Sequence, residues 1–187
     1  MGKVYEEIDE KLAEFIGRQH LFFVGTAPTE LNGRLNISPK GLDTFRILGP
    51  RRVAYLDLTG SGVETIAHLR DNGRMTLMFC AFDGAPLIVR LHGKGTVVEP
   101  SDPEWAELSA KMPDVPGGRA IIAMDVERVS GSCGFAVPLF DYRGERELLV
   151  DFARKRGPEG LVEYRRKKNA RSIDGLEGIS PAEGPAA

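Results

Sequence analysis

The sequence is poor in cysteine and has no excess of charge of either sign. Its 187 residues include two cysteines, Cys80 and Cys133, too few for a disulfide framework and too far apart for a Cys-x-x-Cys zinc or redox pair. Lys and Arg together number 25 and Asp and Glu number 27, so no global field recruits nucleic acid or an anionic membrane. These absences predict a cytoplasmic protein in which any anion site is local.

Long apolar runs and the common catalytic motifs are also missing. No run approaches the roughly 20 apolar residues of a membrane span, and the first residues are acidic where a signal peptide is basic. We therefore expect neither export nor membrane insertion. His20, His68 and His92 lack zinc-site spacing, and no G-x-S-x-G elbow occurs. The sequence predicts no metal site and identifies no catalytic residue.

The fold class follows from short strands and glycine-marked bends. Six or seven apolar runs with scattered helices, and a bend expected at Gly93 and Gly95, favour a mainly β fold: a small antiparallel barrel with flanking helices. A doubly wound sheet fits poorly, since Gly60-Ser61-Gly62 lacks the third glycine of a dinucleotide fingerprint. We expect a barrel domain over 1–150 and a helical extension with a tail over 151–187. The expected strands are 21–27, 34–38, 53–58, 74–82, one within 86–100 and 119–132; the expected helices are 5–16, 63–72 and 102–112, the last capped by Ser101.

A glycine-rich turn, Thr59-Gly60-Ser61-Gly62-Val63-Glu64-Thr65, lies between an expected strand and an expected helix. A helix N-terminus exposes unpaired N–H groups and the positive end of the helix dipole, so a phosphate can bind there. The alternative is structural: Ser61 and Glu64 have the spacing of a capping box, and the glycines only turn the chain. The residues alone leave both interpretations open.

A segment farther upstream, if it forms a strand, has one polar face. Asn36, Ser38 and Lys40 alternate along it, while Leu35 and Ile37 take the other face, which we expect to pack. Three hydrogen-bonding side chains that end in a lysine suit a polar ring edge or a phosphate. A solvated sheet face has the same alternation, so this pattern also has a structural alternative.

The segment 151–171 has a strongly basic composition. It contains two amphipathic helical pieces that Gly157-Pro158 separates, because proline removes a donor and clashes with the preceding turn. A solvated helix face is one explanation, nucleic-acid binding a second, and attraction of an anionic cofactor across a subunit boundary a third. The net charge of −2 and an aromatic content of 7% disfavour nucleic acid. The basic residues are Arg154, Lys155, Arg156, Arg165, Arg166, Lys167, Lys168 and Arg171.

Several of these segments together resemble the pyridoxamine 5′-phosphate oxidase-like family. The resemblance runs from about Ile8 to Val129 and rests on N-I-S-P-K-G, V-A-Y-L-D-L, T-G-S-G-V-E-T, A-H-L-R-D-N-G-R and M-T-L-M-F-C-A-F. The ending K-N-A-R-S-I-D-G-L-E-G resembles the tail of one branch of that family. The resemblance implies a split antiparallel β-barrel that forms a homodimer and binds flavin mononucleotide (FMN) in clefts between the subunits.

The same resemblance implies a cofactor site and a departure from the oxidase itself. It places the strand with Asn36, Ser38 and Lys40 and the turn from Thr59 to Thr65 beside the flavin. Where the oxidase has an Arg-Lys pair just inside the helix, this chain has Glu64-Thr65. The cofactor-binding residues implied are Asn36, Ser38, Lys40, Thr59, Gly60, Ser61, Gly62, Thr65 and Arg70, with Lys40 or Arg70 as the charge partner of the phosphate.

We therefore expect an FMN-dependent oxidoreductase that acts on a small molecule other than pyridoxamine phosphate. A deazaflavin-dependent reductase and a non-catalytic flavin or haem storage protein are the alternatives. In each case the cofactor would supply the chemistry, and the protein would supply position, hydrogen bonds and exclusion of water.

Overall fold

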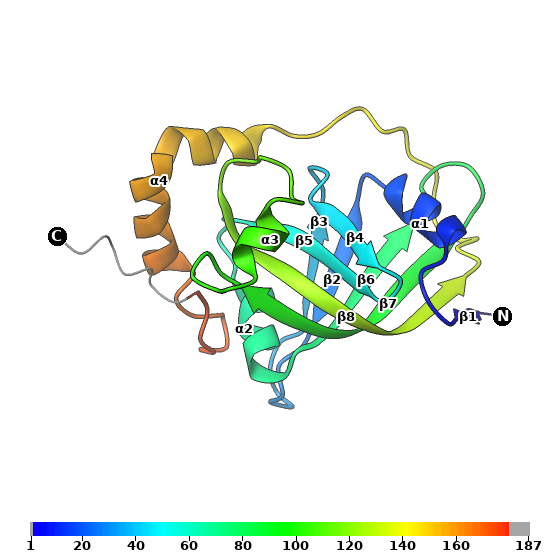
Figure 1. Cartoon of the computed structure of the whole chain (residues 1–187), viewed down its shortest axis with the longest axis horizontal. Helices are drawn as coiled ribbons and strands as arrows, with labels where there is room; N and C mark the ends of the chain where they lie inside the picture. The colour runs from blue at the N-terminus through cyan, green and yellow to red at the C-terminus, as the bar shows by residue number, and fades with distance from the viewer. Residues whose placement is uncertain (1, 180–187) are drawn as a thin grey trace.

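An eight-stranded antiparallel sheet forms the body of the molecule (Figure 1). The structure is a computed structural model and describes residues 2–179. The strands pair in the order β3-β2-β6-β7-β8-β5-β4, with β1 added to β8, and the end strands β3 and β4 do not pair with each other. The barrel is therefore split between these two strands. The strands are β1 Lys3–Tyr5, β2 Phe22–Thr26, β3 Asn36–Lys40, β4 Phe45–Gly49, β5 Arg52–Leu58, β6 Arg74–Cys80, β7 Ile88–Val98 and β8 Gly118–Ser132.

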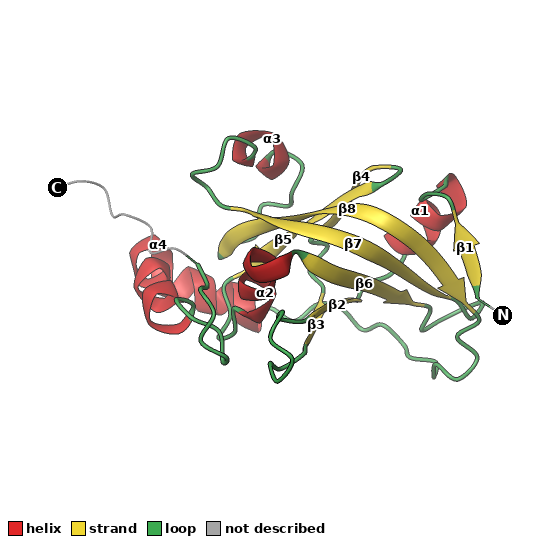
Figure 2. Cartoon of the chain, turned by 90° about the horizontal axis from the view of Figure 1, so that it is seen from below, coloured by secondary structure: helices red, strands yellow, loops and turns green. Residues whose placement is uncertain are grey.

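Helices pack around the sheet at separate places (Figure 2). They are α1 Glu10–Gly17, α2 Glu64–Asn72, α3 Trp105–Ser109 and α4 Leu148–Lys168. The carboxylate of Asp9 caps α1 by accepting the N–H of Leu12 at 2.8 Å. Helix α2 ends at Gly73, whose φ of 71° lies in the left-handed region that glycine adopts without strain. Helix α4 lies at the opposite end of the sheet from α1.

The alternation of apolar residues predicted the core and its principal strands. Val24, Leu77, Leu91 and Ile122 come from four neighbouring strands and have no exposed surface. Helix α1 buries Leu12, Phe15 and Ile16 against the same core, as its periodicity predicted. The hairpin of β2 and β3 is confirmed.

The bend expected in the long β7 strand is also confirmed. The register between β7 and β8 shifts between His92 and Gly93, which marks a β-bulge. A Cβ atom at Gly93 would overlap the carbonyl group of Asp125, so only glycine permits this approach.

Three local expectations were wrong. The helix expected over 102–112 is shortened to α3, and Ser101 does not cap it: Asp102 instead accepts the N–H of Glu99 at 2.7 Å and holds this stretch in a turn. Strands β1 and β4 were not predicted, because both are short and only partly buried. Leu35 and Ile37 are 78% and 74% exposed rather than packed, because β3 is an end strand with no layer over that face.

The C-terminal extension is a kinked helix followed by a segment that folds back. Gly157, with φ 66° and ψ 175°, divides α4 into the two helical pieces that were predicted. Residues 169–179, the described part of the expected tail, pack on the barrel: Asn169, Ser172 and Ile179 are buried. The rest of the expected tail, 180–187, lies outside the described residues.

Candidate functional site

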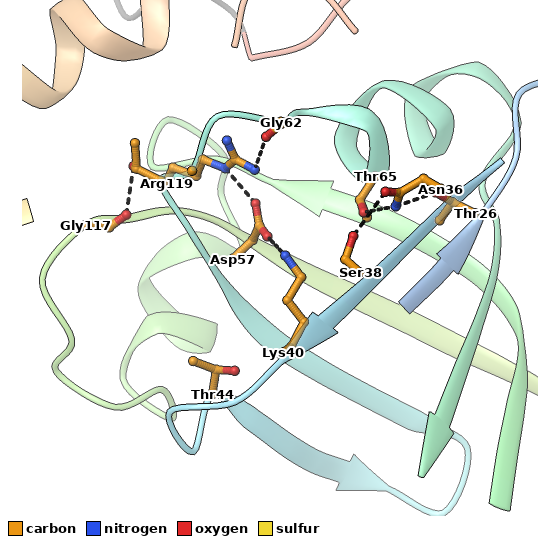
Figure 3. Close-up of polar contacts among 12 residues, drawn as sticks. Thr26, Asn36, Ser38, Lys40, Thr44, Asp57, Gly62, Thr65, Gly117 and Arg119 are labelled. Atoms are coloured by element: carbon orange, nitrogen blue, oxygen red, sulfur yellow. Dashed lines mark hydrogen bonds and ion pairs between the residues drawn. The ribbon is translucent and has the colours of Figure 1, made fainter. Parts of the chain in front are cut away.

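A cavity of about 250 Å³, here called the inner cavity, opens at the split of the barrel (Figure 3). Its walls come from β3, from the loop 41–44, from β5 and from the turn that leads into α2. Six of the nine predicted cofactor-binding residues line it. The lining residues are Asn36, Ser38, Pro39, Lys40, Gly41, Leu42, Thr44, Leu56, Leu58, Gly60, Gly62, Glu64, Thr65, Arg119 and Leu149.

A buried carboxylate between two cations forms one wall of the inner cavity. Asp57, fully buried on β5, accepts from the Lys40 ammonium at 2.8 Å and from Nε of Arg119 at 2.7 Å. Burial alone would raise the pKa of Asp57, but Lys40 and Arg119 outweigh it and hold that pKa below its usual value. Asp57 is therefore ionised and fixes both cations in place.

Arg119 retains one unused donor. Its Nη2 atom donates to the carbonyl oxygen of Gly62 at 2.8 Å, and its Nε to Asp57, but its buried Nη1 has no hydrogen-bond partner within the described residues. The residue is 5% exposed and lines the inner cavity. A buried guanidinium nitrogen without a partner is costly, so an acceptor in the cavity would be stabilised there.

Asp57 and Arg119 were missed by sequence reasoning. Each lies within an otherwise apolar segment, V-A-Y-L-D-L or R-A-I-I-A-M, which was interpreted as a strand without a site residue. The available signal was the charge itself, since Asp and Arg are almost never fully buried unless they are paired.

A network of neutral hydrogen bonds ties β3 to α2. Asn36 Nδ2 donates to Thr65 Oγ1 at 3.0 Å and to Thr26 Oγ1 at 3.3 Å, while the Ser38 hydroxyl donates to Asn36 Oδ1 at 3.1 Å (Figure 3). Thr26 also contacts His68 Nδ1 at 2.9 Å. Burial lowers the pKa of His68 despite the nearby carboxylates, which keeps this network neutral. The polar face of β3 is thus a fixed part of the site.

The extension holds the glycine-rich turn from outside. Arg165 Nε donates to Thr59 Oγ1 at 2.9 Å, and Asn169 Nδ2 donates to the carbonyl oxygen of Gly60 at 2.9 Å. Thr59 in turn donates to Gly117 at 2.8 Å and does not line the inner cavity. Burial, and after it the charge of Arg119, lowers the pKa of Arg165. The guanidinium groups of Arg119 and Arg165 therefore both lie near this turn. The other seven basic residues of the segment 151–171 are exposed.

Two further predicted residues, Ser61 and Arg70, are not among the lining residues of the inner cavity. Ser61 is exposed. Arg70 donates to the carbonyl oxygen of Gly178 and pairs with Glu99, so its charge is directed to the extension and to the segment after β7.

The capping-box alternative for the turn is wrong. Helix α2 begins after Val63 without a side-chain cap, so Ser61 and Glu64 do not bond to its first turn. The Glu64 carboxylate accepts the N–H of Ile173 at 3.2 Å and thereby contacts the extension.

The family model described as "Pyridoxamine 5'-phosphate oxidase" matches residues 8–133. The chain is 42% identical, over 198 aligned residues, to the pyridoxamine 5′-phosphate oxidase family protein ustO of Aspergillus flavus; the alignment covers 95% of this chain and 78% of that protein. The family match ends before the extension, whereas the similarity to the fungal protein includes most of it.

Two solved structures are similar in fold. HupZ of Group A Streptococcus superposes with a TM-score of 0.51 at 23% identity, covering 65% of this chain and 91% of that one. A candidate pyridoxamine 5′-phosphate oxidase of Lactobacillus delbrueckii gives 0.52 at 19% identity, covering 68% and 98%. Among the described residues, no helix is long and apolar enough to span a bilayer, and no cluster of three metal-ligating side chains occurs.

Proposed function

The chain belongs to the pyridoxamine 5′-phosphate oxidase family, and from that premise we propose that it is a flavin-dependent oxidoreductase that holds FMN in the inner cavity. One observation carries the proposal. Lys40 on β3 and Arg119 on β8 line the same cavity as the N-terminus of α2, and the buried Nη1 of Arg119 has no hydrogen-bond partner among residues 2–179.

The charges around the glycine-rich turn suit an anion. Lys40, Arg119 and Arg165 contribute three positive charges near it, against the two carboxylates of Asp57 and Glu64. Phosphate oxygens accept charge-assisted hydrogen bonds most strongly from a guanidinium and from the backbone N–H groups of a helix N-terminus. We place the phosphate of FMN at Arg119 Nη1 and the turn at Gly60–Gly62.

The polar face of β3 suits the edge of the flavin ring. The neutral network uses the donors of Asn36 and Ser38, so the acceptor oxygens of these two side chains can face a ligand without reorganising. A bound flavin supplies hydride transfer. Lys40, fixed by Asp57, would stabilise negative charge that develops on the ring, and the buried walls would exclude water.

The substrate is a molecule other than pyridoxamine phosphate in this proposal. The resemblance implies an Arg-Lys pair for the phosphate just inside this helix in the oxidase, and this chain has Glu64-Thr65 there instead. That departure is the reason to expect a different substrate.

We also propose that two copies associate to complete the site. The inner cavity is smaller than the roughly 300 Å³ at which ligand pockets begin. Apolar side chains are exposed at Leu35, directly before β3, at Ile37 on β3, and on the segment after β8 at Phe135, Leu139 and Phe140. Gel filtration should give twice the monomer mass, and elution as a monomer at micromolar concentration would contradict the dimer.

A visible spectrum tests the cofactor. Purified protein incubated with FMN and then desalted should retain the flavin absorption bands, and a colourless product would contradict the proposal. Deazaflavin retained in place of FMN would assign the reductase alternative. Loaded protein should then be reduced by NADPH and reoxidised by an acceptor over many turnovers; flavin that stays oxidised with NADPH and NADH would indicate storage.

A further inference from the structure

A second cavity, here called the outer cavity, adjoins the inner one and has a different chemistry. Its volume is about 490 Å³, and the two cavities share Gly41, Leu42 and Thr44. Three phenylalanines contribute its apolar lining, with ring centroids 5.0 to 5.6 Å apart: Phe22, Phe45 and Phe79. This surface suits a flat apolar group, since aromatic rings favour edge and offset contacts at such distances.

An aromatic pair and carboxylates complete the wall of the outer cavity. His20 and Tyr142 stack with their centroids 3.6 Å apart and their planes 6° apart. The Tyr142 hydroxyl donates to Glu145 Oε1 at 3.1 Å, and desolvation first, then the hydrogen bond to Glu145 and its charge, raise the pKa of Tyr142. The second carboxylate, Asp43, pairs with Arg46.

The electrostatics of the outer cavity are therefore acidic. Its described lining residues include no lysine and no arginine. Glu145 is held there by a neutral phenol, which orients the carboxylate without neutralising its charge. A cation would be stabilised at this position by the Glu145 carboxylate, while a phosphate or carboxylate would be repelled.

The loop between the two cavities is strained and firmly held. Leu42 and Asp43 have φ values of 60° and 51°, which are uncommon for residues other than glycine. Thr44 donates to the carbonyl oxygen of Gly41 at 2.8 Å, and Arg46 donates to the carbonyl oxygen of Asp43 at 2.8 Å. Such strain persists only where the surroundings fix the backbone, and it is concentrated at ligand sites.

We propose that the outer cavity binds an aromatic ring that carries a protonated amine, with the ring against the phenylalanines and the His20–Tyr142 stack and the amine at Glu145. The binding of this ligand in the outer cavity does not depend on the proposed flavin function. Its role as the substrate does rest on that function, because the shared loop places the outer cavity beside the inner one. Tyr142, Glu145 and Val150 lie beyond residue 133, where the family match ends, so this part of the chain sets the preference.

Calorimetric titration of the full-length protein, without added flavin, tests the proposal with two probes of matched size. Tyramine carries the amine, and 4-hydroxyphenylacetate carries a carboxylate instead. Tyramine should bind at least about tenfold more tightly, the size expected when one charged contact changes from attractive to repulsive. Equal affinities, or tighter binding of the acid, would overturn the proposal.

Two variants distinguish a direct contact with the Glu145 carboxylate from the loss of a negative charge anywhere on the protein. Glu145→Gln keeps the side-chain shape and should abolish the preference for tyramine, whereas Glu163→Gln, an exposed residue of α4 paired with Lys167, should leave it unchanged. Unchanged tyramine affinity in Glu145→Gln would contradict the assignment. A melting temperature within a few degrees of the parent would show that both variants are folded.

A competition experiment distinguishes this proposal from the flavin function. Tyramine and FMN should bind together, each with its own affinity, because they occupy different cavities. Mutually exclusive binding would overturn the proposal and would place the flavin ring across both cavities. Tyramine binding without FMN binding would instead sustain the amine site and refute the flavin function.

Discussion

The barrel and the C-terminal extension are held by different forces. The barrel is joined by strand pairing and by a continuous apolar core, whereas the described extension, 151–179, has only three buried hydrophobic residues: Ala153, Leu161 and Ile179. Its contacts with the turn and with α2 are polar and specific: Arg165 with Thr59, Asn169 with Gly60, and Arg70 with Gly178. A hydrophobic core sets a fold, while hydrogen bonds of this kind set a local geometry.

The barrel and the extension contribute different parts of the candidate site. The barrel provides the cations and the polar strand face, and the extension fixes the turn between them. Changes to the barrel's buried charges should therefore affect stability most, and changes to the extension should affect the site more than the fold.

Removal of the buried carboxylate should have the largest effect. In Asp57→Asn the cations of Lys40 and Arg119 lose their shared counter-charge, and breaking a buried pair costs about 3 kcal/mol of the free energy of unfolding. Urea denaturation measures it. The matched control Glu163→Gln breaks an exposed pair and should leave the free energy of unfolding close to that of the parent protein. Equal effects of the two variants would contradict the buried-triad account.

Loss of the contact from Asn169 should lower stability less than Asp57→Asn does, but it should weaken FMN binding. Asn169→Ala removes the donor to the carbonyl of Gly60 and should cost about 1 to 2 kcal/mol, since Asn169 is fully buried. We expect FMN affinity to fall several-fold as the turn loosens. Lys168→Ala, one residue earlier and exposed, is the control for both measurements. FMN affinity that is unchanged in Asn169→Ala would remove the extension from the site.

The smallest effect is a pH dependence that arises at the boundary of the two regions. His68 on α2 contacts Thr26 of the barrel, and its pKa is lowered by burial even though Glu64 and the extension's Asp174 oppose this. A lowered folded-state pKa means that the unfolded chain binds the proton first. Stability should therefore fall as the pH drops below about 6.5, the usual value for histidine.

Denaturant titrations between pH 5 and 8 measure this slope. His68→Gln should reduce the dependence of the free energy of unfolding on pH. Part of that dependence should remain, because the pKa of His92 is also lowered, by burial and by Arg128 and Arg90. A slope in His68→Gln equal to that of the parent protein would refute the role of His68.

Sequence patterns predicted the barrel because its signals are local and repeated. Strand alternation placed β2, β5, β6, β7 and β8, and Gly93 marked the bulge. They could not predict that Leu35 and Ile37 are exposed, because the position of β3 at the end of the sheet depends on pairing between distant segments.

The site was predicted in part for the same reason. Asn36, Ser38, Lys40 and Thr65 were chosen from one strand and one helix start, and they line one cavity. Asp57 and Arg119 become functional candidates only when β5 and β8 bring them to Lys40, and Asn169 only when the extension folds back on Gly60. Contacts over such sequence separations leave no local periodicity.

In the proposed function, Arg119 and the turn before α2 bind the phosphate of a flavin. Fluorescence titrations with FMN and with riboflavin, which share the ring and differ in the phosphate, test it most directly. FMN should bind at least about tenfold more tightly, and Arg119→Met should bring the two affinities close together. Equal affinities of the parent protein for FMN and riboflavin, or a preference that Arg119→Met leaves intact, would contradict it.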